Sequence, residues 1–405
     1  MEHIRPNRDT LFKEKRRKGD MRVKLYHLSD LHIGLKLFNR DLYEDQDYIF
    51  DKIVESARQE LPDVVIIAGD IYDKAVPSAE AVEVFDRFIT KFSDALPDAE
   101  IMMISGNHDS AARVNVFRSV LERQKIHMIG MPPQKPEEQM EKVTLRDAYG
   151  PVNFYLLPFV KPSMVKAIVG SDENGNNLSY NDTLHKLIKR EEVDTRERNV
   201  FVSHQFYLPA DKNAEDVERM DSEIHTVGNI DSVTADVLAP FDYAALGHIH
   251  KPMKVGSEYY RYSGTPLPCS VSEAGQEKGI IVVELGEKGS VSTRVIPLKP
   301  MREVRVIKGN LEEVLKEGSD DYVTVILTDT VDLDVMDMQD RLRYTFPHLL
   351  EIKRDFIRTA DYKMEYHPEA KRSTFELCND FLKDLDEAEQ KLLQTVINRV
   401  EGAAE

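Results

Sequence analysis

The chain has 405 residues, 41% of them hydrophobic, which is enough to bury one large core and leave material for a smaller second unit. Its formal net charge of -18 argues against a protein that binds nucleic acid through one broad basic face, so such a role would need bound metal, local Arg and Lys side chains, or a partner. No apolar run approaches the roughly 18 residues of a membrane span and no signal-peptide core is visible, so we expect a cytoplasmic protein without a membrane contact.

Cysteine use is sparse. Cys269 and Cys378 are the two cysteines of the chain, they lie far apart, and neither falls in a C-x-x-C pattern. The pattern indicates neither a disulfide framework nor a zinc ribbon. We expect both cysteines to be buried fillers.

The chain begins with a polar, basic stretch over residues 1–20, which we expect to be either a disordered tail or the product of an upstream start. From Met21 to about Gly170, short apolar runs rich in β-branched residues alternate with helical patterns, which is typical of an α/β sheet of two or three layers. The predicted strands are "VKLYHL", "DVVIIAGD" and "EIMMISGNHD". One predicted helix begins near Asp41 and ends at Pro62, and the next begins at Pro77 and Ser78 with an apolar stripe of Val82, Phe85, Ile89 and Phe92.

The second half of this core contains more strand than helix. The strand-like runs are "NFYLLP", "NVFVSHQ", "YAALGHIH", "YRYSGTP" and "GIIVVEL". Around Pro297 to Pro300 the pattern changes, and "EVRVIKG", "LEEVLKEG" and "DYVTVILTD" predict a β-α-β unit in a separate small α+β domain. The last forty residues are charged and helical, with an apolar stripe of Phe381, Leu385, Leu392, Val396 and Val400 that lacks an evident core of its own.

Polar residues interrupt the pattern where five of the predicted strands end. The motifs are "SDLH" after the first strand, "GD" after the second, "GNHD" after the third, and "SH" and "GHIH" after two later ones. The carboxyl ends of strands in an open α/β sheet form the edge at which ligands bind, so five separate segments can deliver side chains to one site. The candidate side chains are Asp30, His32, Asp70, Asn107, His204, His248 and His250.

The types of donor select the ligand. Carboxylate, imidazole and amide oxygen, without thiolate, suit manganese, iron or zinc better than a soft metal. Seven donors are too many for one ion, whereas two ions about 3.5–4 Å apart, bridged by one carboxylate, would use them all and clamp the attacking and leaving oxygens of a phosphate ester. Residues i and i+2 at a strand end project to the same side, so Asp30 and His32 can reach one ion, and His248 and His250 repeat the spacing.

Each motif also has a structural interpretation. D-x-H and G-D are common by chance, and in isolation an N-cap or a turn is the better interpretation of either. G-N-H-D is much more specific, and G-H-x-H is moderately so. Their occurrence in this order, each at a strand end and three of them with a glycine before the polar residue, favours the functional interpretation.

The series D-x-H, G-D-x-x-D, G-N-H-D, S-H and G-H-x-H resembles the calcineurin-like metallophosphoesterases. Within that superfamily, "SDLHIG", "GDIYDKAVP", "GNHDSAAR", "GHIHKP" and "YSGTPLPCSVSE" are similar to the SbcD family of bacterial nuclease subunits, and the resemblance extends from Met21 to the C-terminus. It implies an α/β fold, a β-sandwich flanked by helices, with a small α+β capping domain and a C-terminal helical tail. The expected boundaries are 1–20 for the N-terminal tail, 21–298 for the nuclease domain, 299–365 for the cap and 366–405 for a segment that binds an ATPase partner.

The resemblance also implies roles for individual residues. In the family the first ion is held by residues matching Asp30, His32, Asp70 and His250, and the second by residues matching Asp70, Asn107, His204 and His248, with Asp70 as the bridge. The resemblance assigns to His108 the stabilisation or protonation of the leaving oxygen, and it makes Asp109 the candidate residue that orients the His108 ring. Archaeal relatives carry a histidine where Asp73 stands, so no role is transferred to Asp73.

The implied cofactors are two divalent metal ions, with manganese expected. The implied partners are DNA, as double-stranded ends, hairpins and single strands, and an SbcC-like ATPase with a coiled coil, in a heterotetramer that contains a homodimer of this chain. By resemblance, the helices that carry Phe85, Ile89 and Val116 are candidates for the homodimer contact, although ordinary core packing explains them equally well. A small-molecule or nucleotide phosphodiesterase, a protein phosphatase and a catalytically silent scaffold of the same fold are the alternatives.

Overall fold

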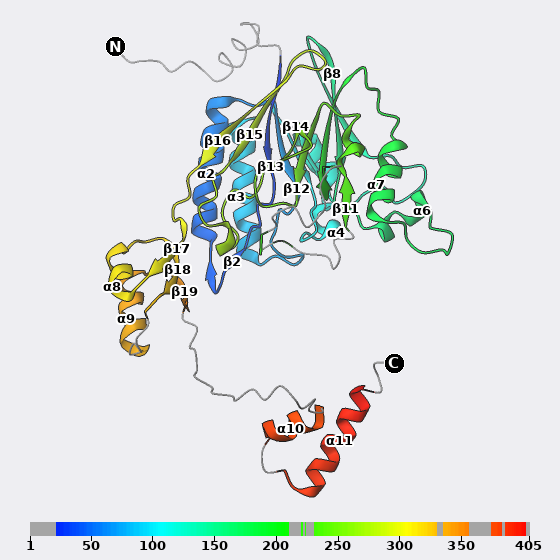
Figure 1. The fold of residues 1–405 in the computed structure, drawn as a ribbon. Coiled ribbons are helices and arrows are strands. Elements are labelled where there is room, and N and C mark those ends of the chain that lie inside the picture. The colour runs from blue at the N-terminus through cyan, green and yellow to red at the C-terminus, as the bar shows by residue number, and fades with distance from the viewer. Residues whose placement is uncertain are drawn as a thin grey trace, which may run out of the picture. The chain divides into compact units, whose positions relative to one another are not determined.

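The computed structural model describes residues 22–209, 220–221, 223, 231–329, 335–355, 374–382 and 385–401 (Figure 1). The tail expected over residues 1–20 and the domain boundary expected at 365/366 lie outside these ranges. The chain divides into two compact units, one that ends at Asp355 and one that holds the two C-terminal helices.

Two six-stranded sheets form the larger part of the first unit, and they contain all the strands predicted before Pro297 (Figure 1). The first sheet has the order β16-β15-β1-β4-β5-β6. Its strands are β1 (Val23–Leu28), β4 (Val64–Ala68), β5 (Glu100–Ile104), β6 (Ile126–Ile129), β15 (Lys278–Leu285) and β16 (Val291–Leu298). The four strands β1, β4, β5 and β6 run parallel, while β15 and β16 are antiparallel additions at one edge.

The second sheet has the order β13-β14-β12-β9-β8-β7. Its strands are β7 (Glu141–Asp147), β8 (Gly150–Leu157), β9 (Arg198–His204), β12 (Tyr243–Gly247), β13 (Met253–Val255) and β14 (Ser257–Tyr262). The central strands β8, β9, β12 and β14 are parallel, so their carboxyl ends lie at one edge of this sheet. Two short ribbons, β2 (Lys36–Leu37) with β3 (Arg40–Asp41) and β10 (Phe206–Leu208) with β11 (Ser232–Thr234), lie outside the two sheets.

Alternation along β1 shows how the core is divided. Val23 and Leu25 are buried between the sheets with side chains of the second sheet, whereas Tyr26 and Leu28 are buried on the opposite face under helices. The first sheet is covered by α2 (Tyr43–Glu60) and α3 (Ala79–Ala95), and the second by α6 (Lys166–Val169), α7 (Tyr180–Lys189) and the 3-10 turn η5 (Ala235–Leu238). The result is the expected β-sandwich flanked by helices.

The stripe predicted for α3 is rotated by about one residue. Ser78 caps the helix as expected, with its hydroxyl accepting the N–H of Ala81 at 3.2 Å. However, the buried face consists of Ala81, Val84, Phe88, Phe92 and Ala95. Val82 is 45% exposed, and Phe85 and Ile89 are only partly buried against the core. Which of the two adjacent apolar rows becomes buried depends on the neighbouring surfaces.

Short helical segments connect the strands. The segment after β5 contains α4 (Ala111–Val114), α5 (Arg118–Leu121) and η1 (Glu122–Gln124). Two further 3-10 turns are η2 (Pro162–Met164) and η6 (Val271–Glu273). Val116 lies between α4 and α5 and is 50% exposed, so it does not contribute to the core as Phe85 and Ile89 do.

The small α+β domain has the predicted β-α-β order. It comprises β17 (Val304–Gly309), α8 (Leu311–Val314), η7 (Leu315–Glu317), β18 (Tyr322–Leu327), α9 (Val335–Thr345) and β19 (Leu349–Arg354), with all strand pairs parallel. It is joined to α2 through Asp45, whose carboxylate accepts the Tyr322 hydroxyl at 2.7 Å and pairs with Arg302 at 3.1 Å. The buried cluster of Leu37, Leu42, Val304 and Tyr322 reinforces this junction.

The C-terminal unit contains α10 (Thr374–Leu382) and α11 (Glu387–Glu401), in agreement with the expected helical tail. Phe381 is 85% exposed, Leu392 65% and Val396 51%, whereas Ile397 is buried. Cys378, on α10, is only partly buried, so the expectation that both cysteines are core fillers is wrong for this one. Among the described helices, none combines the length and the apolar character needed to cross a bilayer.

Candidate metal centre

Five strand ends meet in one place. β1, β4 and β5 are parallel neighbours in the first sheet, and β9 and β12 are parallel neighbours in the second. The polar motifs follow these strands directly, so both sheets direct side chains to a common buried site. The structure brings together all seven predicted donors and His108, namely Asp30, His32, Asp70, Asn107, His108, His204, His248 and His250.

The backbone of this site is strained. Four donors have φ in the left-handed region, which non-glycine residues rarely adopt: Asp30 at 53°, His32 at 42°, Asp70 at 49° and His248 at 106°. Such conformations cost of order 1–3 kcal/mol each and persist only where the surrounding structure enforces them. Here the N–H of Asp30 donates to the carbonyl of Gly69 at 2.9 Å, and the N–H of His32 donates to the carbonyl of Asp70 at 3.0 Å. Strain concentrated in the same loops as the donors is typical of a functional site.

Gly106, the first residue of G-N-H-D, leaves the space into which Asp70 fits. A Cβ at this position would lie 2.1 Å from Asp70 Oδ1 and 2.4 Å from the Asp70 nitrogen. The loops after β4 and β5 can therefore approach each other only with glycine here. The approach lets the N–H of His108 donate to Asp70 Oδ1 at 2.9 Å, which fixes the orientation of that carboxylate.

One half of the site is organised around Asn107. Its Oδ1 lies 2.9 Å from His204 Nε2 and 2.9 Å from His248 Nδ1. His204 Nε2 is also 3.2 Å from Asp70 Oδ2 and 4.0 Å from Asp30 Oδ1. An amide oxygen, two imidazoles and carboxylates thus converge on one point, and this mixture of oxygen and nitrogen donors fits manganese, iron or zinc.

The other half is organised around His32. Its Nε2 lies 3.1 Å from His250 Nε2 and 3.7 Å from Asp70 Oδ2. Asp70 therefore contacts both halves of the site, as a bridging carboxylate would. His108 is close as well, with its ring centroid 4.8 Å from that of His32.

The contact between His32 and His250 fits a metal-binding pair. For two ring nitrogens to meet at 3.1 Å, one of them must carry a proton, and His32 Nδ1 then makes no hydrogen bond although the residue is 1% exposed. A buried acceptor without a partner costs about 1–3 kcal/mol. A cation bound by the two Nε2 atoms would place the His32 proton on Nδ1, which lies 3.7 Å from Asp73 Oδ1. The residues present therefore fit a divalent cation.

Neighbouring groups fix the tautomers of the other imidazoles. His204 Nδ1 contacts the carbonyl of Ala68 at 2.8 Å, and because a carbonyl only accepts, Nδ1 carries the proton and leaves Nε2 for a ligand. His108 Nδ1 contacts the carbonyl of Asp73 at 3.0 Å in the same way. By contrast, His27 is fully buried between the sheets, where it contacts the Tyr243 hydroxyl and the Leu246 carbonyl, as expected for a structural histidine.

The electrostatics of the site favour positive charge. Burial would by itself favour the neutral form of Asp70, but the imidazoles of His204, His32 and His108 hold the pKa of this carboxyl well below its usual range. Burial likewise disfavours a charged His204, yet Asp70 and Asp30 raise the pKa of His204 to about 9. The carboxylates thus stabilise a positive charge on the opposing imidazole, and a divalent cation would supply that charge in place of the proton.

The expectation that Asp109 orients His108 is wrong. The Asp109 carboxylate accepts three backbone N–H groups, from Ile71 at 3.0 Å, Tyr72 at 2.9 Å and Gly106 at 2.9 Å. It therefore fastens the loop after β4 to the loop after β5, while the Asp73 carbonyl orients the His108 ring. The acidic residue of G-N-H-D supports the shape of the site rather than the chemistry.

Sequence reasoning assigned no role to Glu273, which supports His250. Glu273 is completely buried and contacts His250 Nδ1 at 3.3 Å, Thr265 Oγ1 at 3.1 Å and Lys278 Nζ at 2.6 Å. Burial opposes ionisation of this carboxyl, but His250 and Lys278 hold the pKa of Glu273 below its usual range. The motif "YSGTPLPCSVSE" contains this residue, but only the fold reveals its contact with the imidazole.

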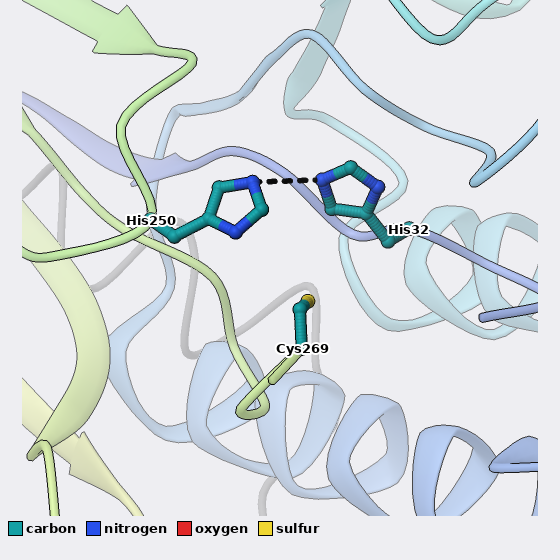
Figure 2. Close-up of side chains that lie close together, drawn as sticks. All are labelled: His32, His250 and Cys269. Atoms are coloured by element: carbon teal, nitrogen blue, oxygen red, sulfur yellow. Dashed lines mark hydrogen bonds between the residues drawn. The ribbon is translucent and has the colours of Figure 1, made fainter. Parts of the chain in front are cut away.

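Cys269, from the same motif, also lies at the site. It is buried, as expected for this cysteine, but its neighbours are polar: one donor atom from each of His32, His250 and Cys269 lies within 4.8 Å of the other two. Figure 2 shows the three side chains converging from three separate loops, with the sulfur on the side of Cys269 that faces the two rings. The seven predicted donors include no thiol, and the structure adds the buried Cys269 as a neighbour of two of them.

Two family profiles and two related sequences identify the family of the chain. The profile of the family described as Calcineurin-like phosphoesterase matches residues 23–252, and that of the Type 5 capsule protein repressor C-terminal domain, SbcD_C, matches residues 300–385. The chain is 33% identical over 304 residues to the SbcD subunit of the SbcCD nuclease of Staphylococcus saprophyticus subsp. saprophyticus, covering 73% of this chain and 74% of the relative. It is 29% identical over 337 residues to the SbcD subunit of the same nuclease in Staphylococcus epidermidis, covering 82% and 85%. A solved dimetal phosphatase from Danio rerio, at 14% identity, aligns with 68% of this chain and 99% of its own, with a TM-score of 0.35. The chain therefore belongs to the SbcD family of calcineurin-like phosphoesterases.

Proposed function

We propose that this chain is the nuclease subunit of an SbcCD-like complex and hydrolyses DNA phosphodiesters with two divalent metal ions, expected to be manganese. The observation that carries the proposal is the position of Asp70. Its Oδ2 lies 3.2 Å from His204 Nε2 in one half of the site and 3.7 Å from His32 Nε2 in the other. A carboxylate shared between two donor groups is the arrangement that two-metal phosphodiester hydrolysis requires.

The proposed donors of each cation are the two sets that the family resemblance implies; Asp30, which lies 4.0 Å from His204 Nε2 in the Asn107 half, belongs to the first set on that basis. The first set is Asp30, His32, Asp70 and His250, and the second is Asp70, Asn107, His204 and His248. These residues would hold two cations, which would supply neutralisation of the phosphate charge and activation of a water nucleophile. The cations also explain how a chain with a net charge of -18 accepts a polyanion, because they bring positive charge to the point where phosphate binds.

The protein contributes orientation and proton transfer. Asp70 is held by the N–H of His108, and Glu273 contacts the ring of His250 on the side away from the site. The His108 ring is held through Nδ1 by the Asp73 carbonyl, so its other nitrogen, Nε2, is the one that can give a proton to the departing sugar oxygen. No covalent intermediate with the enzyme is needed.

The same proposal assigns the parts of the chain. Residues 21–298 form the nuclease domain, 299–365 the cap, and 366–405 the segment that binds an SbcC-like ATPase through its coiled coil. The exposed apolar side chains of Phe381, Leu392 and Val396 support this assignment, because an amphipathic helix without a core of its own gains stability in a partner groove. With the ATPase and ATP the activity is exonucleolytic on duplex ends, and the enzyme is also an endonuclease on hairpins and single strands. The assembly is a cytoplasmic heterotetramer with a homodimer of this chain.

The test is manganese-dependent cleavage of end-labelled duplex and hairpin DNA, with and without the ATPase and ATP. Asp70→Asn should abolish cleavage. Asp51→Asn is the matched control, because Asp51 is an exposed acid on α2 that pairs with surface Lys91. Rapid hydrolysis of nucleotides or small phosphodiesters without any cleavage of DNA would contradict the proposal and favour a small-molecule enzyme of the same fold.

A further inference from the structure

We propose that Cys269, together with His32 and His250, forms a thiol-containing binding set for a thiophilic divalent cation such as Zn²⁺ or Cd²⁺. The three residues come from the loop after β1, the loop after β12 and the segment between β14 and η6, and the fold buries all of them. His32 and His250 are 218 positions apart in the chain, so the set exists only in the folded state.

The spacing of the donor atoms supports the set. One atom from each residue lies within 4.8 Å of the other two, and the two Nε2 atoms are 3.1 Å apart (Figure 2). In a tetrahedral zinc site, metal–ligand distances of about 2.0–2.3 Å place nitrogen donors roughly 3.4 Å apart and nitrogen and sulfur roughly 3.6 Å apart. The two Nε2 atoms are therefore already close to the required separation, and the thiol completes the set by moving closer to them.

The existing contacts of these residues do not oppose such binding. The Cys269 thiol makes a single long hydrogen bond, 3.6 Å to the carbonyl of Leu267, which is weak. His32 Nδ1 makes no hydrogen bond in the described structure, and binding through Nε2 would place its proton opposite Asp73 Oδ1. On binding, the thiol loses its proton to solvent and the thiolate sulfur becomes the ligand.

The ligand chemistry predicts selectivity. Thiolate with two imidazoles is a donor set that prefers zinc and cadmium, whereas carboxylate, amide and imidazole suit manganese. Because His32 and His250 also belong to the proposed first manganese set, a thiophilic cation held here would displace manganese and inhibit DNA cleavage. This last consequence rests on the proposed function, while the binding itself does not.

The chain offers a direct test, because Cys269 and Cys378 are its two cysteines. In the full-length Cys378→Ser protein, freed of metal, the sole remaining thiol is Cys269. Titration with CdCl₂ should then produce an ultraviolet sulfur-to-cadmium charge-transfer band that saturates at one Cd²⁺ per chain. The Cys269→Ser variant, which retains Cys378, should not show the charge-transfer band of the proposed site. Circular dichroism tests whether this variant folds.

Two further measurements test the set as a whole. In the Cys378→Ser background, His250→Gln should raise the Cd²⁺ concentration for half-saturation of the band by at least about tenfold. Cys269→Ser should weaken Cd²⁺ binding, measured calorimetrically, by a larger factor than it weakens Mn²⁺ binding. Absence of the band in Cys378→Ser, or a band insensitive to His250→Gln, would overturn the inference.

The outcome is separable from that of the proposed function. If the band is absent while manganese-dependent DNA cleavage is intact, the thiol set is wrong and the nuclease proposal stands. If the band behaves as expected but DNA is not cleaved, the nuclease proposal fails and the cation set stands. Inhibition of cleavage by Cd²⁺ that weakens in Cys269→Ser would support both.

Discussion

The carboxylate of Glu273 provides the sharpest test of how the protein holds its proposed metal ligands. Glu273→Gln keeps the size of the side chain and removes its charge. The carboxylate contacts the imidazole of His250 at 3.3 Å and the ammonium of Lys278 at 2.6 Å, in a place where both acid and base side chains are almost fully buried. The substitution therefore has two effects, one on the metal ligand and one on the fold.

The two effects have different magnitudes. Loss of a carboxylate behind a metal-bound imidazole weakens metal binding by about 10–100-fold, or about 1.4–2.7 kcal/mol. Loss of one partner from a buried ion pair destabilises the fold by about 3–5 kcal/mol, because the remaining charge is uncompensated. The second effect could mask the first, so the comparison must remove the lysine charge as well.

The matched pair is therefore Lys278→Met with and without Glu273→Gln, with the free energy of unfolding measured for both, because Lys278→Met alone leaves the buried Glu273 carboxylate without its cation. Both variants lack the ammonium, and they differ in the carboxylate that faces His250. We expect the double variant to bind Mn²⁺ about 10–100-fold more weakly than Lys278→Met, as measured by electron paramagnetic resonance of free Mn²⁺ during titration. Equal Mn²⁺ affinity in the two folded variants would refute the reasoning that Glu273 positions His250.

Three further predictions concern the centre and its frame. Asp70→Asn should abolish both the binding of two Mn²⁺ ions and DNA cleavage, and retention of two ions would contradict its bridging role. His108→Gln should keep Mn²⁺ affinity, measured calorimetrically, but lower kcat by about 10²–10⁴-fold, whereas full turnover would remove its role in proton transfer. His27→Gln should flatten the acid side of the stability curve. Burial lowers the pKa of His27 to about 3, so between that value and the ordinary value of about 6.5 the unfolded chain binds the extra proton and stability falls as pH falls. Between pH 6 and pH 4 the free energy of unfolding of the wild type should fall by about 2.5 kcal/mol more than that of His27→Gln. The measurement is denaturant unfolding with a chelator present. If the stability of the two proteins changes with pH in parallel, His27 is charged in the folded state.

The exposure of apolar side chains on α10 and α11 has a consequence for how the protein should be handled. Phe381, Leu392 and Val396 are more than half exposed in a unit that has little core of its own. An exposed apolar surface of this kind favours association with a partner and, without that partner, self-association. Assays of the isolated chain are therefore best accompanied by assays with the ATPase.

The sequence by itself predicted the strands that lead into the site and named the seven candidate donors, while the sandwich class followed from the family resemblance. These features are local: strands follow from runs of β-branched residues, and donors stand out because polar residues at strand ends need a reason to be there. The prediction that Asp30 and Asp70 lie at one edge needed only the rule that parallel strands align their carboxyl ends.

Tertiary structure alone decided which neighbours these residues have. The choice of Val84 and Phe88 rather than Val82 and Phe85 for the buried face of α3 depends on the surface of the sheet below it. The contact of Glu273 with His250, and that of Asp109 with backbone N–H groups instead of His108, depends on loops that meet only after both sheets have formed. Side-chain periodicity carries information over a few residues, whereas such contacts are set by strand order and packing across hundreds of positions. Cys269 illustrates the difference, since its sequence neighbours indicate a core filler and its spatial neighbours are two imidazoles that we propose as metal ligands.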